Sequence, residues 1–198
     1  MMILTYRNQL STQITREDVS EAILWGINMA KTSGGVRTYQ QGTSTYRKRQ
    51  AEVEAMRASG RYSSVEMGKG GGYFAIEKSP ARHKPEELEA ARILAGKGYK
   101  VTLKNESGMN KTPDGYLFKA SFEQRTPTGN SAKNIRSSLY HGRDKKADIP
   151  VLYMKGNGHT RKSVEDGIKY FESSSKYRFK EIIIVTQDGR IHRHKHNS

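Results

Sequence analysis

Two short, uninterrupted runs of apolar residues constrain the fold of this chain most. They span Ile149 to Met154 and Ile182 to Val185. A strand that alternates apolar and polar residues can leave one face in water, whereas a continuous apolar strand needs cover on both faces. Between the two runs, the segment from Thr160 to Phe171 repeats its apolar residues at helical spacing. The sequence therefore predicts buried strands in a sheet that is covered by helices.

The same patterns extend over the second part of the chain. Further strands are expected at Tyr73 to Glu77, Tyr99 to Leu103, Tyr116 to Arg125 and Ile191 to His194, and further helices at Pro85 to Gly96 and Asn134 to Tyr140. Strands and helices that alternate in this order predict an α+β fold. We expect a mixed or antiparallel sheet of four to five strands packed with two to three helices.

The first part of the chain has a different character. Helical spacing predicts helices from Thr15 to Ala30 and from Tyr46 to Ala58, and the glycine-rich stretch Gly68 to Gly72 is typical of a linker or hinge. We therefore divide the chain into a helical N-terminal appendage of unknown role, residues 1–72, and a main domain, residues 73–198.

The charge balance indicates a polyanionic partner. Thirty-five Lys and Arg residues oppose twenty Asp and Glu, which gives a net charge of +15. Residues 73–198 hold twenty-five of these cations and fourteen of the anions, so most of the excess lies in the main domain. Such a field concentrates nucleic acid, although an acidic protein partner would also suit it.

Composition also excludes several kinds of site. The chain has no cysteine, which rules out disulfides, thiolate metal sites and a cysteine nucleophile. The N-terminal sequence lacks the apolar core of a signal peptide, and its apolar runs are too short to span a bilayer. We expect a cytoplasmic location, in the producing cell or in a target cell.

The window from Thr112 to Asn134 holds the candidate site. As one straight strand, Tyr116 to Arg125 has an apolar face and a polar face. Its polar face would present Lys119, Ser121, Glu123 and Arg125, so it is free to line a site. A Pro-Asp turn precedes this strand and Thr126 follows it. Carboxylates and a cation at this spacing are typical of sites that cleave phosphodiesters.

Several short motifs, taken in order, resemble a known family. They are His83-Lys84-Pro85, Thr112-Pro113-Asp114-Gly115, Phe122-Glu123-x-Arg125-Thr126-Pro127, Asn130-Ser131 and Lys146-Ala147-Asp148. Over residues 73–195 the series resembles the C-terminal tRNA-nuclease domain of contact-dependent growth inhibition (CdiA-type) polymorphic toxins. The resemblance implies a compact fold akin to barnase, colicin D and RelE. It also implies tRNA as the substrate and a cognate immunity protein as a partner.

Two mechanisms fit these residues. Relatives commonly carry lysine where this chain has Arg125, and arginine does not lose its proton to act as a base. We therefore favour a metal-independent ribonuclease without a cofactor. Glu123 would be the base, Arg125 would stabilise charge on the phosphate, and Thr126 would bind it. His141 would be the acid, and Asp114 would complete the catalytic group.

The alternative is a metal-dependent nuclease of the PD-(D/E)xK kind. In that mechanism Asp114 and Glu123 would hold Mg²⁺. A third alternative is a nucleic-acid-binding protein of a mobile element that does not cut. Asp114-Gly115 would then be an ordinary turn, and Glu123 and Arg125 a solvated ion pair.

The nucleic-acid contacts are expected on and beside the helix that follows the strand. The candidates are Lys119, Thr128, Lys133, Asn134, Arg136, Arg143, Lys145 and Lys146. Rings interleaved with cations in the first part of the chain, at Tyr39, Tyr46 and Tyr62, suit base stacking, although structural packing or disorder is the favoured explanation.

Overall fold

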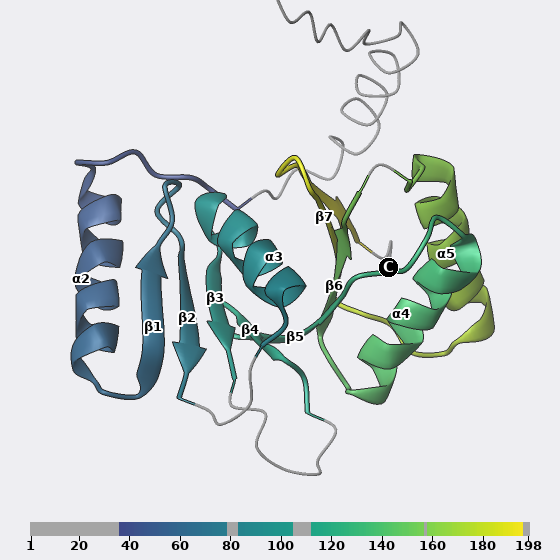
Figure 1. Cartoon of the computed structure of the whole chain (residues 1–198), viewed down its shortest axis with the longest axis horizontal. Coiled ribbons are helices and arrows are strands. Elements are labelled where there is room, and N and C mark those ends of the chain that lie inside the picture. Colours follow the sequence, from purple (N-terminus) through teal and green to yellow (C-terminus); the bar gives the residue numbers. More distant parts are fainter. Residues whose placement is uncertain (1–35, 79–82, 105–111, 157, 196–198) are drawn as a thin grey trace, which may run out of the picture. The chain divides into compact units, whose positions relative to one another are not determined.

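The computed structural model describes residues 36–78, 83–104, 112–156 and 158–195. They form an α+β fold in which helices pack on a mixed β-sheet (Figure 1). The predicted fold class is confirmed. The sheet is larger than expected, with eight strands, and four helices lie within the described ranges. The helix expected from Thr15 to Ala30 lies outside the described residues.

The described elements alternate along the chain. The helices are α2 (Ser44–Ala58), α3 (Pro85–Gly96), α4 (Ala132–Asp144) and α5 (Arg161–Ser174). The strands are β1 (Tyr62–Met67), β2 (Tyr73–Glu77), β3 (Lys100–Leu103), β4 (Gly115–Leu117), β5 (Ala120–Arg125), β6 (Ile149–Met154), β7 (Ile182–Thr186) and β8 (Ile191–His194). In the parts of the chain that the structure describes, no helix is both long and apolar enough to cross a membrane.

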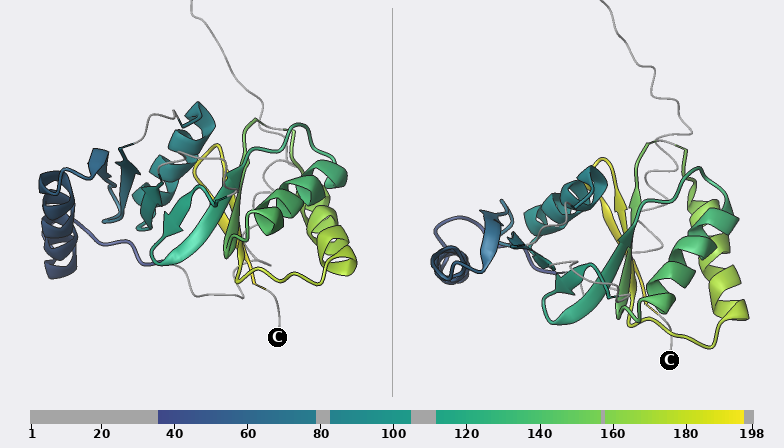
Figure 2. Two further views of the ribbon diagram at one scale, coloured as in Figure 1. Left: turned by 90° about the horizontal axis from the view of Figure 1, so that it is seen from below. Right: turned by 60° about the horizontal axis from the view of Figure 1, so that its bottom comes forward.

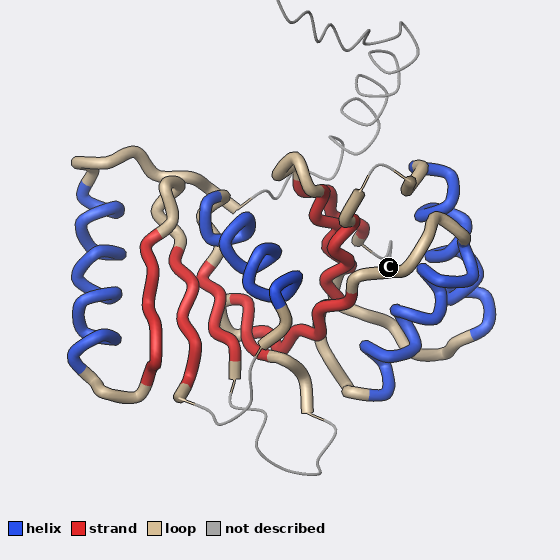
Figure 3. Tube along the Cα trace, in the orientation of Figure 1, coloured by secondary structure: helices blue, strands red, loops and turns tan. Residues whose placement is uncertain are grey.

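The strands lie in the sheet in the same order as in the sequence, as the red tube in Figure 3 shows. Neighbouring strands run antiparallel except for three pairs, β2 with β3, β5 with β6, and β6 with β7. A parallel pair needs a crossover connection. Here the three crossovers contain α3, α4 and α5, so the helices follow from the strand directions.

The two faces of the sheet carry different helices. On one face α3 packs against β2, β3 and β7, and buries Leu94 against Val101, Leu103 and Phe122. On the other face α4 packs against β5 and β6, and α5 packs against α4. Figure 2 shows α3 on one side of β6 and β7 and α4 with α5 on the other. The runs in β6 and β7 are therefore buried from both sides, as their composition predicts.

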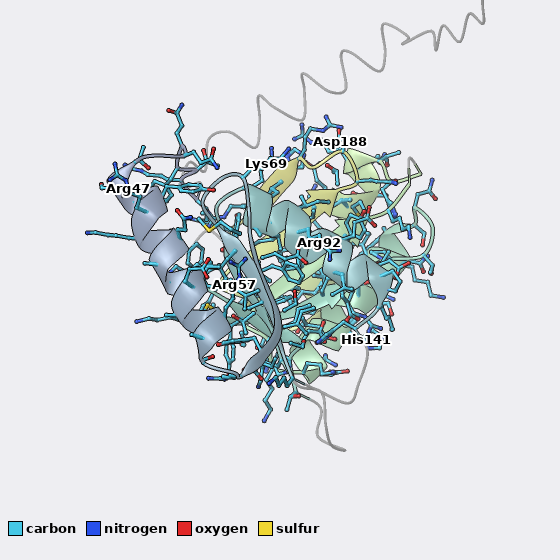
Figure 4. The ribbon with its side chains drawn as sticks, turned by 60° about the vertical axis from the view of Figure 1, so that its left-hand side comes forward. Arg47, Arg57, Lys69, Arg92, His141 and Asp188 are labelled. Carbon is cyan, nitrogen blue, oxygen red and sulfur yellow. The ribbon has the colours of Figure 1, made fainter. Side chains whose placement is uncertain are left out.

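Helix α2 covers the first strands of the sheet. Val53 on α2 packs against Val65 of β1 and Ala75 of β2. The Arg57 side chain of α2 donates hydrogen bonds to the backbone carbonyl of Val65 at 3.0 and 3.2 Å, and Figure 4 shows it reaching toward β1. The predicted boundary between residues 72 and 73 falls in the connection between β1 and β2, which pair with each other in one sheet.

The glycine-rich stretch is a packed turn, and the prediction of a linker was wrong. The Gly68 amide donates to the Gly72 carbonyl at 2.8 Å, and the turn lies on the C-terminal end of α3. A Cβ atom on Gly68 would come within 2.2 Å of the Ala95 carbonyl oxygen, and one on Gly72 within 2.2 Å of that of Tyr99. These glycines are needed because backbone packs directly on backbone.

The segment from Tyr116 to Arg125 is also not the straight strand that the alternation predicted. It is a hairpin, in which β4 and β5 are joined by a tight turn at Phe118 and Lys119, and Phe118 has a φ of 55°. Leu117 pairs with Ala120 across the turn, and this pairing determines which side chains of β4 and β5 share a face of the sheet. Phe122 joins the core with Leu117, while Tyr116 and Phe118 are exposed.

Candidate active site

The hairpin brings two carboxyl groups together. Gly115 of β4 pairs with Phe122 of β5 in an antiparallel register. Asp114, one residue before Gly115, therefore faces Glu123, one residue after Phe122. Both side chains lie on the face of the sheet away from the core residue Phe122. Asp114 is 4% exposed and Glu123 is 1% exposed. A solvated surface ion pair between Glu123 and Arg125 is thus excluded.

Backbone hydrogen bonds fix the position of Asp114. Its Oδ2 atom accepts a hydrogen bond from the Gln124 amide at 2.7 Å. Its own carbonyl accepts one from the Lys104 amide at 2.8 Å, which continues the ladder between β3 and β4. The carboxylate is therefore held by the sheet rather than by a mobile loop.

The Asp114–Glu123 pair resists carrying two negative charges. Burial, the negative charge of Asp114 and a hydrogen bond between the two side chains together raise the pKa of Glu123 to about 8. Lys145 and Arg125 act in the opposite direction. With no cation bound, the pair accordingly holds a shared proton at neutral pH.

Two cations flank Glu123. The Arg125 Nη1 atom lies 4.0 Å from Glu123 Oε1, and the Lys145 Nζ atom lies 3.9 Å from Glu123 Oε2. Lys145 also donates a hydrogen bond to the Thr112 carbonyl at 2.9 Å, which holds its ammonium group beside the pair. The buried Oε2 atom has no hydrogen-bond partner among the described residues, so this acceptor is unsatisfied in the structure.

Helix α4 delivers Lys145 to this place. Its N-cap Ser131 accepts a hydrogen bond from the Asn134 amide, and Ile135 and Leu139 face the interior. A Cβ atom on Gly142 would lie 3.4 Å from the ring of Pro150 in β6, so the last turn of α4 approaches the sheet closely. Pro150 pairs with Glu123. Lys145, which caps α4, therefore lies level with Glu123.

An open groove of about 420 Å³ continues from Arg125. It is lined by the end of β5, the start of α3 and one side of α4. Of the residues predicted from the sequence, it brings together Arg125, Thr126, Thr128, Asn134 and His141. Lys84, Glu86 and Glu87 at the start of α3 form the opposite wall. His141 is exposed on α4, at the edge of the molecule away from α2 in Figure 4.

The remaining predicted contacts are spread more widely. Lys119 lies in the hairpin turn, at the other end of β4 and β5 from the carboxylates. Lys133 and Lys146 are exposed on and after α4. Arg136 lies over the Tyr170 ring at 6.0 Å. Arg143 is paired with Asp144 at 2.7 Å and lies over the Tyr140 ring at 4.5 Å.

The carboxylate pair belongs to a row of charged residues across the sheet. The strand registers place Glu77 of β2, Lys104 after β3, Asp114 and Glu123 side by side on one face. Among the described residues, no group of three or more His, Cys, Asp or Glu side chains is arranged to hold a metal ion. The pair by itself offers two carboxylates to a cation.

Sequence reasoning assigned Lys145 to a phosphate contact and missed its place beside Glu123. A signal was present in the order of elements. The chain leaves β5, crosses in α4 and returns parallel to β5 in β6, so the residues just before β6 lie level with the start of β5. Lys145 and Lys146 occupy that position.

Comparison with known proteins gives few matches. The chain matches no protein-family model and no curated protein. Among solved structures it is similar to a chain of a "CdiA-CT/CdiI toxin and immunity complex" from Burkholderia pseudomallei. The TM-score is 0.48 and the identity is 20%, over 61% of this chain and 98% of that chain.

Proposed function

We propose that the protein is a nuclease that cleaves phosphodiester bonds with the help of a divalent cation. One observation supports this proposal above others. The buried pair Asp114 and Glu123 is flanked by Arg125 at 4.0 Å and by Lys145 at 3.9 Å from Glu123. The absence of lysine at position 125 argued against metal dependence, and Lys145 supplies an ammonium group from a different element.

The residues of the pair fit a hard cation. Mg²⁺ prefers oxygen ligands and is often held by only one or two carboxylates, with water and substrate phosphate oxygens in the other positions. Asp114 and Glu123 supply such a set, and within the described part of the chain no donor reaches Glu123 Oε2. When bound, the cation would polarise the phosphate and lower the pKa of a coordinated water.

The protein residues have separate tasks in this proposal. Asp114 and Glu123 would hold the cation, and they would release the proton that they share when it binds. Arg125 has a planar fork that can bind two phosphate oxygens, and its side chain borders the groove. Lys145, held by the Thr112 carbonyl, places a positive charge where a nucleophilic oxygen would approach. Thr126 and Asn134 offer hydrogen bonds further along the groove.

The metal-independent mechanism is a second candidate because of the pKa of Glu123. A carboxyl group with a pKa near 8 can accept and release a proton close to neutral pH. Arg125 lies beside it, and His141 lines the same groove. However, Glu123 is 1% exposed, and a base must reach the 2′-hydroxyl of its substrate within hydrogen-bond distance.

For the substrate and the biological role, we propose a toxin that cleaves tRNA and is inhibited by an immunity protein. The sequence resemblance over residues 73–195 supports this, and so does the net charge of +15, which suits both a polyanionic RNA and an acidic inhibitor. Expression of the wild-type chain should arrest growth, and expression of a Glu123→Gln variant should not.

Cleavage assays distinguish the mechanisms. Purified protein is incubated with total tRNA and with single-stranded DNA, in Mg²⁺, in Mn²⁺ and in EDTA. We expect cleavage only with metal, on both RNA and DNA, with no 2′,3′-cyclic phosphate ends. Cleavage of RNA alone in EDTA, leaving cyclic ends, would support the metal-independent route. Salt-sensitive binding without cleavage in any buffer would leave a binding protein.

Two neighbouring lysines provide a matched pair of variants. Lys145→Met should lower the single-turnover rate at saturating enzyme by at least about 100-fold, because the charge beside Glu123 is lost. Lys146→Met removes the next, exposed charge and should change that rate by less than about threefold. Equal effects of the two variants would refute a specific role for Lys145.

A further inference from the structure

An exposed tyrosine lies close to the carboxylate pair. Tyr116 is the middle residue of β4, and its side chain is on the same face as Asp114, two residues earlier. Residues two apart in a strand are separated by about 7 Å. Although β4 lies between β3 and β5 inside the sheet (Figure 1), Tyr116 is 38% exposed.

The neighbours of Tyr116 explain why a ring inside a sheet remains accessible. Its cross-strand partners are Thr102 of β3 and Ser121 of β5. Both side chains are small, so they do not cover the ring. Further along the same row, Ala75 of β2 is buried beneath Val53 of α2. The accessible part of this row is therefore the Tyr116 ring with Thr102 and Ser121 on either side.

A cation lies against this ring. The Lys104 Nζ atom lies 5.2 Å from the centroid of the Tyr116 ring, within the range of a cation–π contact. The pKa of Arg61 is raised chiefly by its hydrogen bond with Glu77, and to a smaller extent by nearby tyrosine hydroxyls that include that of Tyr116. An exposed ring with a cation beside it suits a nucleobase whose phosphates are anionic.

Other exposed rings are less suited to the same task. Phe118 is 42% exposed, but it packs against the Tyr99 ring at 5.9 Å, and Arg49 lies over it at 6.0 Å. Tyr170 is 56% exposed, but it is not beside the carboxylates. It lies on α5, a helix that packs against α4. Tyr46, one of the rings that the sequence suggested for stacking, is buried.

We propose that Tyr116, with Lys104 beside it and Asp114 two residues away, is the platform on which an unpaired base next to the cleaved phosphodiester stacks. The substrate is then a single strand or a loop, because a base inside a continuous duplex cannot reach the ring. This inference rests on the proposed nuclease function and adds the class of substrate. Stacking on one ring tolerates any base, so it selects for structure rather than for sequence.

Binding without cleavage tests the platform. In the full chain carrying Glu123→Gln, a single-stranded oligonucleotide with 2-aminopurine at one position is titrated with protein, position by position. Stacking quenches the fluorescence of this base. We expect strong quenching at one position, and Tyr116→Ala should abolish it and weaken binding about 5- to 100-fold. Tyr116→Phe should retain both, because it keeps the ring.

Tyr170→Ala is the matched control, since it removes another exposed tyrosine that has a cation over its ring. It should leave quenching and affinity unchanged. The melting temperature of each variant is measured alongside, and Tyr116→Ala should stay folded because its ring is partly in solvent. Unchanged quenching in Tyr116→Ala would overturn the platform. Equal loss in Tyr116→Phe would also overturn it, because the hydroxyl would then be responsible.

The two proposals fail separately. A protein that does not cleave in any buffer, yet shows quenching that depends on Tyr116, refutes the nuclease and supports the platform. Cleavage that Tyr116→Ala leaves unchanged refutes the platform alone. Continuous duplex that binds as tightly as single strand, with the same dependence on Tyr116, overturns the inferred substrate class.

Discussion

The Glu123→Gln variant replaces a buried carboxyl group by an amide that carries no charge at any pH. In the wild type, burial and the neighbouring Asp114 raise the pKa of Glu123 from 4.5 to about 8. The folded state therefore keeps a proton between these values that the unfolded state has already lost. The contribution of Glu123 to stability is present in full below pH 4.5 and is lost as the pH rises through about 8.

The magnitude follows from the two pKa values. One proton bound in the folded state but not in the unfolded state changes the free energy of unfolding by at most about 1.4 kcal/mol per pH unit. The slope depends only on the difference in the number of bound protons between the two states. Between pH 5.5 and 7.5 the wild type should lose roughly 2–3 kcal/mol relative to Glu123→Gln, or about 4–12 °C in melting temperature for a chain of this size.

The assay is the difference in unfolding free energy between the two proteins, measured by urea denaturation in EDTA from pH 5 to pH 8.5. Taking the difference removes other groups that titrate in this range. Burial lowers the pKa of His159 and of His192, so both destabilise the fold as the pH falls, but both are present in each protein. Addition of Mg²⁺ should stabilise the wild type at pH 8 and leave Glu123→Gln unchanged.

Glu86→Gln is the control for this experiment. Glu86 is paired with Lys155 at 3.0 Å, and this contact lowers its pKa, so its difference curve should be flat above pH 5. A flat curve for Glu123→Gln as well would refute the shared proton. A wild type that gains stability over Glu123→Gln with rising pH would show that Lys145 and Arg125 keep Glu123 ionised.

Three other substitutions test separate parts of the site. Arg125→Lys keeps the charge but loses the planar fork, and should lower kcat/KM for tRNA cleavage by about 10- to 100-fold without changing the melting temperature. Gly115→Ala should destabilise the fold by about 3 kcal/mol or more in urea denaturation, because its Cβ atom would lie 2.0 Å from the Thr102 oxygen and 2.9 Å from the Phe122 ring; an unchanged midpoint would contradict the β3–β4–β5 packing. Ser121→Ala removes hydrogen bonds to the Asp148 amide and carboxylate, at 3.0 and 2.9 Å, and should cost about 1–3 kcal/mol in the same assay; no cost would mean that these bonds are exchanged freely for water.

Much of the fold could be predicted from the sequence because the strong patterns are local. The apolar runs of β6 and β7 indicate strands that are buried on both faces. Helical spacing predicts a helix from Thr160, and Thr160 is the N-cap of α5. The start of α3 at Pro85 likewise follows from proline at a first helical position. Each of these signals is contained in fewer than fifteen residues.

The hairpin could not be predicted because its turn lacks the usual residues. Phe118 and Lys119 include no Gly, Asn, Asp or Pro, although Phe118 adopts a positive φ of 55°. The amide of Phe118 donates to the Lys100 carbonyl at 2.8 Å, and its ring contacts that of Tyr99. Tertiary contacts therefore hold the turn, and a sequence pattern carries no information about them. The unrecognised turn left the faces of β5 as predicted, but it put Tyr116 on the face of Ser121 rather than on the face of Phe122.

The same turn creates the site. In a straight strand Asp114 and Glu123 would lie nine residues apart, about 30 Å. The hairpin register places them opposite each other, and the parallel register of β5 and β6 then sets Lys145 beside them. A slip of one residue in either register would move one partner to the other face of the sheet.

This dependence on register bears on why two carboxyl groups are buried together at all. An apolar pair at positions 114 and 123 would be easier to bury, since removing like charges from water is costly and a half-satisfied pair adds to the cost. The fold retains the carboxyl groups and positions them through the backbone ladder, and none of the residues that the structure describes donates to Glu123 Oε2. The folded state loses stability when both Asp114 and Glu123 carry a negative charge and no cation is bound between them. A bound cation provides that compensation, so the feature that weakens the isolated fold is the one that the proposed chemistry requires.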